Sequence, residues 1–248
     1  MTSSDMACHI IGQERPSDIV ITCDHASNRV PPQVNGGDLG LPPAEMERHI
    51  AYDVGAAGVA RHLGALMDAP VICSDFSRLV IDPNRGEDDP TLIMQIYDGT
   101  IIPANRNLTD EQVNWRLENC YRPYHAALAG LLDSRARPVM VAIHSFTPRL
   151  NGHAMRPWHI GILHGRDQRL ALPLLARLRA EPDLCVGENE PYGGHLDGDS
   201  IDRHAIRHDR PNVLIELRND LIRAPEQQQH WAARLAPTLQ EVIAAADL

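Results

Sequence analysis

The amino-acid sequence predicts an α/β fold in which a mostly parallel sheet is covered by helices on both faces. Two observations lead to this fold class. Short apolar runs without charge recur along the chain, as expected for strands buried on both faces of a sheet. Segments with apolar residues at helical spacing separate most of these runs, and alternating strands and helices indicate parallel pairing. All 248 residues are expected to form one domain, with residues 1–16 as an irregular lead-in.

The predicted strands are short runs of apolar and often β-branched residues. In chain order they are Ile19–Cys23, Val71–Cys73, Leu79–Ile81, Val139–Ile143, His159–Leu163 and Val213–Leu217. The predicted helices are Glu45–Met67, Thr109–Leu132, Gln168–Arg179 and Pro225–Ala245. The sequence T-D-E-Q at the start of the second helix is a capping box, and Pro123 is expected to kink that helix. Pro225 suits the first position of the last helix.

Two long segments, Asp82–Leu108 and Glu188–Arg210, contain no predicted helix or strand. Loops of this length are uncommon inside a compact domain, and most of those that occur are binding loops or lids. We therefore expect both segments to contribute to a functional site.

The composition excludes several classes of function. Apolar residues make up 43% of the chain and charged residues 23%, as in ordinary globular proteins. The formal net charge of −10 argues against nucleic acids or anionic membranes as the main partner. No apolar run approaches the roughly 20 residues of a membrane span, and the first residues lack the apolar region of a signal peptide. The five cysteines are scattered without a C-x-x-C pair, so a cytoplasmic location is expected.

Two of the predicted strands are followed at once by a histidine. His25 comes soon after Ile19–Cys23, and His144 comes directly after Val139–Ile143. Ligands of open α/β sheets bind outside the carboxyl ends of the strands, so both imidazoles are expected at one site. Histidine is the commonest protein ligand for metals, and a catalytic zinc needs three protein ligands. The candidates for the third ligand are Asp53, Asp24 and Asn28. The alternative interpretation is a pair of loop histidines that bind no metal.

The predicted strand Leu79–Ile81 leads into the sequence D-P-N-R. The guanidinium of Arg85 can hold a carboxylate through two parallel hydrogen bonds, and the amide of Asn84 can donate and accept. The pair is a candidate anchor for an anionic substrate. The alternative is a surface ion pair between Asp82 and Arg85 in a turn.

Glu216 interrupts the apolar strand Val213–Leu217. Burying a carboxylate without a partner is costly. Either Glu216 forms an ion pair with another arginine or with Arg218, two residues later on the same face, or it projects into a site as a general base. The residues alone leave both interpretations open.

Six motifs, in order along nearly the whole chain, resemble the N-formylglutamate amidohydrolase family. They are D-H-A-S (24–27), S-R-L-V-I-D-P-N-R (77–85), H-S-F-T-P (144–148), R-P-W (156–158), N-E-P-Y (189–192) and I-E-L-R-N-D-L (215–221). This family is similar in fold to zinc carboxypeptidases and aspartoacylases. The resemblance implies a three-layer α/β/α sandwich with a mostly parallel mixed sheet, phosphorylase/hydrolase-like. It also implies a metal-dependent amidohydrolase that cleaves the N-acyl amide of an amino acid such as N-formylglutamate.

The resemblance further implies roles for individual residues. His25 and His144 match metal-binding histidines, and Glu216 and Arg85 are the expected catalytic residues. The H-x-x-E ligand pair of the carboxypeptidases is absent because residue 28 is asparagine. This absence leaves the third ligand for Zn²⁺ or another divalent transition metal open among Asp53, Asp24 and Asn28, of which we prefer Asp53. The expected substrate-binding residues are Asn84, Arg85, Arg78, Ser145, Arg156, Asn189, Tyr192 and Arg218.

Two rival functions remain open. Cys23 or Ser145 could be the nucleophile of a metal-free hydrolase beside His25 or His144, although a cysteine in an apolar strand is more often a small core residue. The chain could also be a non-catalytic protein that binds an acidic ligand at Arg85. In each case the expected partner is a small molecule and not a nucleic acid or a membrane, and the protein is expected to be a monomer or homodimer.

Overall fold

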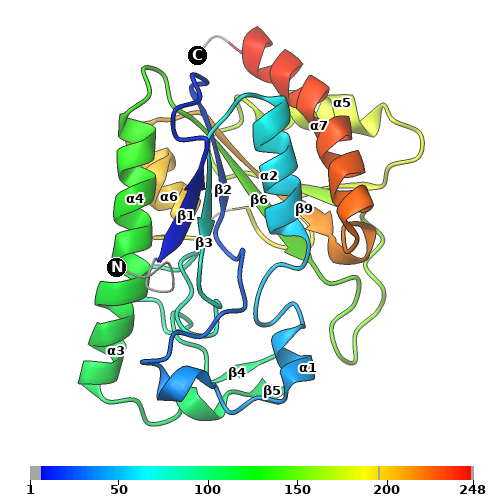
Figure 1. Cartoon of the computed structure of the whole chain (residues 1–248). Coiled ribbons are helices and arrows are strands. Elements are labelled where there is room, and N and C mark those ends of the chain that lie inside the picture. Colours follow the sequence, from blue (N-terminus) through cyan, green and yellow to red (C-terminus); the bar gives the residue numbers. More distant parts are fainter. Residues whose placement is uncertain (1–6, 195, 247–248) are drawn as a thin grey trace.

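The computed structural model describes residues 7–194 and 196–246, which are organised around a seven-stranded sheet (Figure 1). The strand order is β1-β3-β2-β6-β9-β7-β8. The strands are β1 (Cys8–Ile11), β2 (Ile19–Cys23), β3 (Val71–Ser74), β6 (Val139–Phe146), β7 (Ile160–Leu163), β8 (Val186–Glu188) and β9 (Asn212–Arg218). The pairings of β1 with β3 and of β7 with β9 are antiparallel, and the other four are parallel. The predicted mostly parallel mixed sheet is confirmed.

Helices cover both faces of the sheet, which gives the predicted three-layer α/β/α sandwich (Figure 1). One face carries α2 (Ala56–Leu66), α5 (Ala171–Arg179) and α7 (Pro225–Ala245). The other carries α3 (Asp110–Arg116), α4 (Arg122–Asp133) and α6 (Ser200–His204).

The alternation of side chains along the strands decides which helical layer each residue meets. Ile21 and Val141 belong to the core under α2, α5 and α7, whereas Val20 and Met140 belong to the core under α4 and α6. Successive side chains of a strand point to opposite faces. His144, four residues after Met140 in β6, therefore lies on the α4 and α6 face.

The predicted helix from Thr109 forms as two helices joined by one wider turn. Thr109 Oγ1 accepts a hydrogen bond from the Gln112 N–H, and the Gln112 side chain accepts one from the Thr109 N–H, so the predicted capping box is present. A π-helical turn, Leu117–Tyr121, joins α3 to α4 and ends two residues before Pro123. Proline cannot donate to the preceding turn, which explains the irregularity at the predicted position.

The predicted single helix Glu45–Met67 is wrong. The segment forms a short α1 (Pro43–Met46), then loop, and then α2. Gly55 takes a left-handed conformation (φ 84°) at the start of α2. Within the loop the Asp53 N–H donates to the His25 carbonyl (2.9 Å). The break therefore brings Asp53 to the end of β2, where a continuous helix would not have placed it.

The predicted strand Leu79–Ile81 is also wrong. These residues are buried, but their backbone forms turns, and the Leu79 and Val80 carbonyls accept hydrogen bonds from the side chains of Asn105 and Arg116. Their apolar character reflects packing in the core under α4. The lead-in expected to be irregular contains β1, and residues 1–6 lie outside the described part of the chain.

The two long segments contain only short elements. Residues 82–108 include the two-stranded sheet of β4 (Ile96–Tyr97) and β5 (Thr100–Ile101), and residues 188–210 include α6. Within the described residues no helix is both long enough and apolar enough to cross a membrane.

Candidate active site

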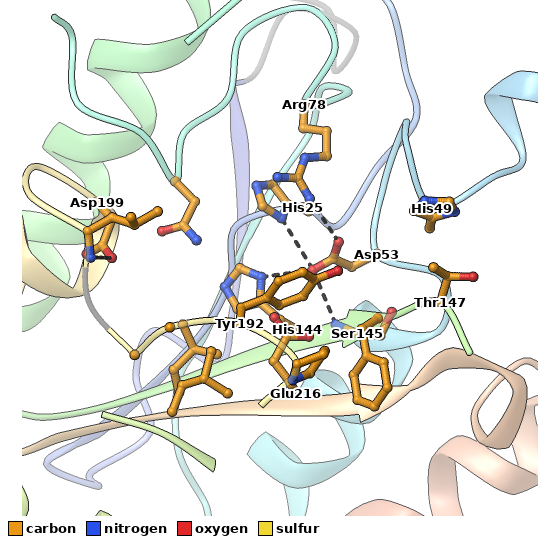
Figure 2. A pocket seen from close by; sticks show the side chains of 18 of the residues that line it. His25, His49, Asp53, Arg78, His144, Ser145, Thr147, Tyr192, Asp199 and Glu216 are labelled. Carbon is orange, nitrogen blue, oxygen red and sulfur yellow. Dashed lines mark hydrogen bonds and ion pairs between the residues drawn. The ribbon is translucent and has the colours of Figure 1, made fainter. Parts of the chain in front are cut away.

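A cavity of about 450 Å³ opens at the carboxyl ends of β2, β6 and β9 (Figure 2). Nine of the residues selected from the sequence line it: His25, Asp53, Arg78, Asn84, Arg85, His144, Ser145, Tyr192 and Glu216. Three more, Arg156, Asn189 and Arg218, lie outside its wall.

Asp53 lies between the two histidines (Figure 2). Its Oδ2 atom is 2.8 Å from Nδ1 of His144 and 3.3 Å from Nδ1 of His25. The Ser145 N–H donates to the same oxygen (3.2 Å). All three side chains of the His25, Asp53 and His144 cluster are buried, and one ligand atom from each lies within 4.8 Å of the others. This spacing could hold a metal ion.

Each imidazole faces a second carboxylate with its other nitrogen. Nε2 of His25 lies 2.7 Å from Oδ1 of Asp82, and Nε2 of His144 lies 3.4 Å from Oδ2 of Asp24. Asp82 also accepts two hydrogen bonds from the guanidinium of Arg78 (3.1 and 2.8 Å). A metal-binding histidine usually donates its second ring N–H to a carboxylate or carbonyl, which fixes the tautomer. Both Nδ1 atoms are thus on the side of Asp53.

The groups in this cluster stabilise one another's charges. Burial by itself would raise the pKa of Asp53, but hydrogen bonds and charge interactions with His25 and His144 outweigh it and lower that pKa. Burial would lower the pKa of His144, but Asp24 and Asp53 outweigh it and raise that pKa well above its usual value. The cluster is therefore built to hold positive charge among carboxylates, as a cation site requires.

Of the three candidates for a third metal ligand, Asp53 alone has a carboxylate next to both Nδ1 atoms. Asp24 lies on the Nε2 side of His144. The Asn28 side chain donates to the Met46 carbonyl (2.9 Å), and it does not line the cavity.

Glu216 lies beside His144 because the two residues are partners in the parallel pairing of β9 with β6. Its Oε2 atom is buried and has no hydrogen-bond partner among the described residues. Burial raises the pKa of Glu216 to about 7; the charge of His144 opposes this effect and that of Asp53 adds to it. A carboxyl group with a pKa near 7 can take up and release protons under ordinary conditions.

The alternative ion pair between Glu216 and Arg218 is not formed, although the structure describes both residues. Nε of Arg218 donates to Oδ1 of Asp220 (2.8 Å), and Nη1 approaches the backbone carbonyls of residues 156–158 at 3.3–3.4 Å. Arg218 therefore fastens the segment before β7 to the end of β9.

Arg85 and Asn84 line the cavity next to α6. Arg85 donates to Oγ1 of Thr91 (3.1 Å) and to the Asn84 carbonyl (2.7 Å), and it forms no ion pair with a carboxylate in the described part of the chain. The alternative pairing of Asp82 with Arg85 is absent because the buried Asp82 binds Arg78 and His25 instead. Oδ1 of Asn84 accepts a hydrogen bond from the Ser200 N–H (3.1 Å).

Tyr192 comes from the long segment after β8 and its ring lies over the site (Figure 2). Its hydroxyl accepts a hydrogen bond from Arg156 (3.2 Å), whose guanidinium also lies 5.0 Å from the centre of the ring. Asn189 fastens the start of this segment, since its Oδ1 accepts from the His164 N–H (2.9 Å) and its own N–H donates to Ile162 (3.0 Å). Arg156 thus contacts Tyr192 from outside the cavity, and Asn189 fastens the start of the segment that carries Tyr192.

Some residues of the cavity were not selected from the sequence. They include His49, Tyr97, Phe146, Thr147 and Asp199. Burial lowers the pKa of His49 to about 4, and its ring meets the Tyr97 ring edge-on at 6.1 Å. His49 belongs to the segment that was predicted to be helical, so the search for polar residues at strand ends could not find it.

Comparisons with known proteins agree with the motifs. A family model for N-formylglutamate amidohydrolases matches residues 17–223. The chain is 27% identical over 208 residues to N-formylglutamate deformylase of Pseudomonas putida, a match that covers 75% of this chain and 73% of that protein.

Two solved structures extend this comparison. Gene product Atu2144 from Agrobacterium tumefaciens is 33% identical, with a TM-score of 0.92 over 99% of this chain and 98% of that one. N-formylglutamate amidohydrolase from Ralstonia eutropha JMP134 is 21% identical, with a TM-score of 0.63 over 95% and 98%, and so shares the fold. Because the family model spans most of the chain, this protein belongs to the N-formylglutamate amidohydrolase family.

Proposed function

We propose that this protein is a metal-dependent amidohydrolase that removes the acyl group, formyl above all, from an N-acyl amino acid such as N-formylglutamate. The observation that carries the proposal is the convergence of His25, His144 and Asp53, with Glu216 beside them in the same cavity. The similarity to the P. putida N-formylglutamate deformylase supports the choice of substrate.

The three side chains fit a catalytic zinc site. Two imidazoles and one carboxylate are a known ligand set for catalytic Zn²⁺, which keeps its fourth position open for water or substrate. The hydrogen bond of His25 to Asp82 supplies the outer carboxylate that such histidines commonly have. Since other divalent transition metals accept the same ligands, Zn²⁺ is the first metal to test rather than the sole candidate.

The bound metal would polarise the acyl carbonyl and lower the pKa of a water toward about 7. Glu216 would act as the general base, taking a proton from the attacking water and returning it to the leaving nitrogen. Its burial and its pKa near 7 suit both steps. The products would be formate, for a formyl substrate, and the free amino acid.

Arg85 and Asn84 would bind a carboxylate of the substrate. Arg85 has no carboxylate partner among the described residues, so its charge is available to an anionic ligand. Arg78 is less available, because its guanidinium is bound to Asp82 and lies 3.5 Å from Asp53. Tyr192 would cover the substrate from the solvent side, held by Arg156.

The rival functions have less support. Cys23 is fully buried in the core under α2 and α7 and does not line the cavity. Its hydrogen bond with Cys73 and, to a smaller extent, its burial raise the pKa of its thiol well above the usual value. The Ser145 hydroxyl donates to the Val54 carbonyl (2.9 Å) and not to a histidine. Neither residue is arranged as an activated nucleophile. A binding protein without catalysis would need no unpaired buried carboxylate at Glu216.

The test is formate release from N-formyl-L-glutamate by protein stripped with a chelator and then reloaded. We expect activity to disappear on stripping and to return with one equivalent of Zn²⁺ per chain. His144→Ala should bind no stoichiometric metal and show no activity, whereas His153→Ala, at an exposed histidine, should behave as wild type. Full activity in the stripped protein would overturn metal dependence, and loaded protein that cleaves no N-acyl amino acid would overturn the reaction.

A further inference from the structure

Asp24 is buried at the end of β2 and faces His144 of the neighbouring strand β6. Its Oδ2 atom lies 3.4 Å from Nε2 of His144. Both atoms are buried, and neither forms a hydrogen bond with any other atom of the described residues. Leaving a buried polar group unpaired is costly, because the group loses its hydrogen bonds to water and gains none in the protein. Since 3.4 Å is only slightly longer than an ordinary N–H···O hydrogen bond, these two atoms are the natural partners of each other.

The other oxygen of Asp24 is held from two helices. Oδ1 accepts hydrogen bonds from the Tyr124 hydroxyl on α4 and from Oγ of Ser200 at the start of α6 (3.3 Å). All three side chains are at most 1% exposed. A carboxylate fixed in this way has little freedom to turn, so the direction of Oδ2 toward His144 is set by the packing of both helices against the sheet.

We propose that Asp24 is a positioning residue for the metal site. Its carboxylate, fixed by Tyr124 and Ser200, accepts the Nε2–H of His144 and thereby holds the tautomer in which Nδ1 carries a lone pair directed at Asp53. Asp24 would thus act on His144 as Asp82 acts on His25. The inference rests on the proposed function, because it assigns a role toward the proposed metal.

The competing role is purely structural. The same hydrogen bonds tie β2 to α4 and α6, and a tie of this kind would affect stability without affecting the metal. The two roles differ in one readout: only a positioning residue changes the affinity and the ligand geometry of a metal bound by folded protein. Outer partners of metal-binding histidines typically contribute 10–100-fold in metal affinity.

The experiment compares Zn²⁺ affinity in full-length wild type, Asp24→Asn, Tyr124→Phe and a matched control. The control is Thr22→Val, because Thr22 is equally buried, lies two residues earlier in β2 and has a hydroxyl without a partner among the described residues. Each metal-free protein is first checked for cooperative thermal unfolding. Zn²⁺ is then titrated in competition with a chromophoric chelator, and the visible absorption of the Co²⁺-loaded proteins is recorded.

We expect Asp24→Asn to bind Zn²⁺ about 10–100-fold more weakly than wild type and to alter the cobalt spectrum. Tyr124→Phe, which removes only one hydroxyl, should show a smaller loss in the same direction, and it provides the test if Asp24→Asn does not fold. Thr22→Val should match wild type. Folded Asp24→Asn with wild-type affinity and spectrum would overturn this inference alone. A wild type that binds neither metal would overturn both the inference and the proposed function.

Discussion

His144 and Glu216 are register partners in the two neighbouring parallel strands β6 and β9. Their side chains lie on the same face of the sheet and at the same level, where both line the cavity. The pairing places a proposed metal ligand next to a buried carboxylate that has an unpaired oxygen. The roles of the surrounding residues can therefore be separated by single substitutions.

Glu216→Gln should lower kcat by roughly 10²–10⁴-fold, the usual contribution of a general base. Glutamine keeps the shape of the side chain but cannot take the proton. Metal content should not change because Glu216 is not a proposed ligand, and the melting temperature should not fall because no ion pair is lost. Arg218→Gln serves as the control, since it removes the pair with Asp220 and the contacts with the backbone carbonyls of residues 156–158 but leaves the Glu216 carboxylate in place. A Glu216→Gln variant with full kcat would show that this carboxylate is not the general base.

Arg85→Ala should raise KM for N-formyl-L-glutamate roughly ten- to a hundred-fold, with a much smaller change in kcat. The estimate follows from the ~1.5–3 kcal/mol of a hydrogen bond to a charged group. Arg85→Lys should restore little, because lysine lacks the planar pair of donors. Steady-state kinetics measure both effects, with Arg122→Ala, at a surface arginine paired with Glu87, as the control. An unchanged KM would assign the anchor to another cationic side chain, Arg78 first.

Asp53→Asn should abolish stoichiometric zinc binding, because it removes the carboxylate that lies next to both Nδ1 atoms. Asn28→Ala should keep zinc, because the Asn28 side chain binds the Met46 carbonyl away from the cavity. Metal analysis after dialysis against zinc-free buffer distinguishes the two variants. Retention of one zinc by Asp53→Asn together with its loss from Asn28→Ala would reverse the choice of third ligand.

The buried pair of His125 on α4 and His204 on α6 should make stability fall in mild acid. Nδ1 of His125 lies 2.8 Å from Nε2 of His204, and burial lowers the pKa of His125 to about 3 and that of His204 to about 4. In the unfolded chain both titrate near 6.5. The unfolded state therefore binds more protons than the folded state between about pH 6.5 and pH 4. The stability that the pair contributes to the folded state is complete above pH 6.5 and is lost as the pH falls through that range.

We expect a loss on the order of 2–4 kcal/mol in unfolding free energy between pH 7 and pH 5, measured by denaturant titration. The charged groups that act on the pair are Arg203, Arg210, His208 and Asp24. His204→Gln should reduce the pH dependence, whereas His230→Gln, at an exposed histidine of α7, should leave it unchanged. Equal pH dependence in wild type and His204→Gln would contradict the assignment.

The elements that the sequence predicted well are those whose signal is local. The strands β2, β6 and β9 have the charge-free or nearly charge-free apolar pattern of central strands, and each begins within one residue of its predicted start. The strand β6 continues to Phe146, so His144 lies within the strand and not after it as predicted. The helix α7 begins at Pro225 and ends at Ala245 as predicted. The apolar pattern failed at Leu79–Ile81, because a buried segment needs apolar side chains whether or not its backbone joins a sheet.

The sequence by itself determined the mixed sheet with helices on both faces, and it marked His25 and His144 as polar residues at the ends of central strands. The positions of the two histidines follow from the regular alternation of strands and helices, which short-range patterns encode. Only the tertiary structure decided that Asp53 lies between them, that Asp82 and Asp24 face their outer nitrogens, and that Arg156 and Asn189 lie outside the cavity. These side chains come from loops and strand ends, and hydrogen bonds to residues distant in sequence fix where such segments lie.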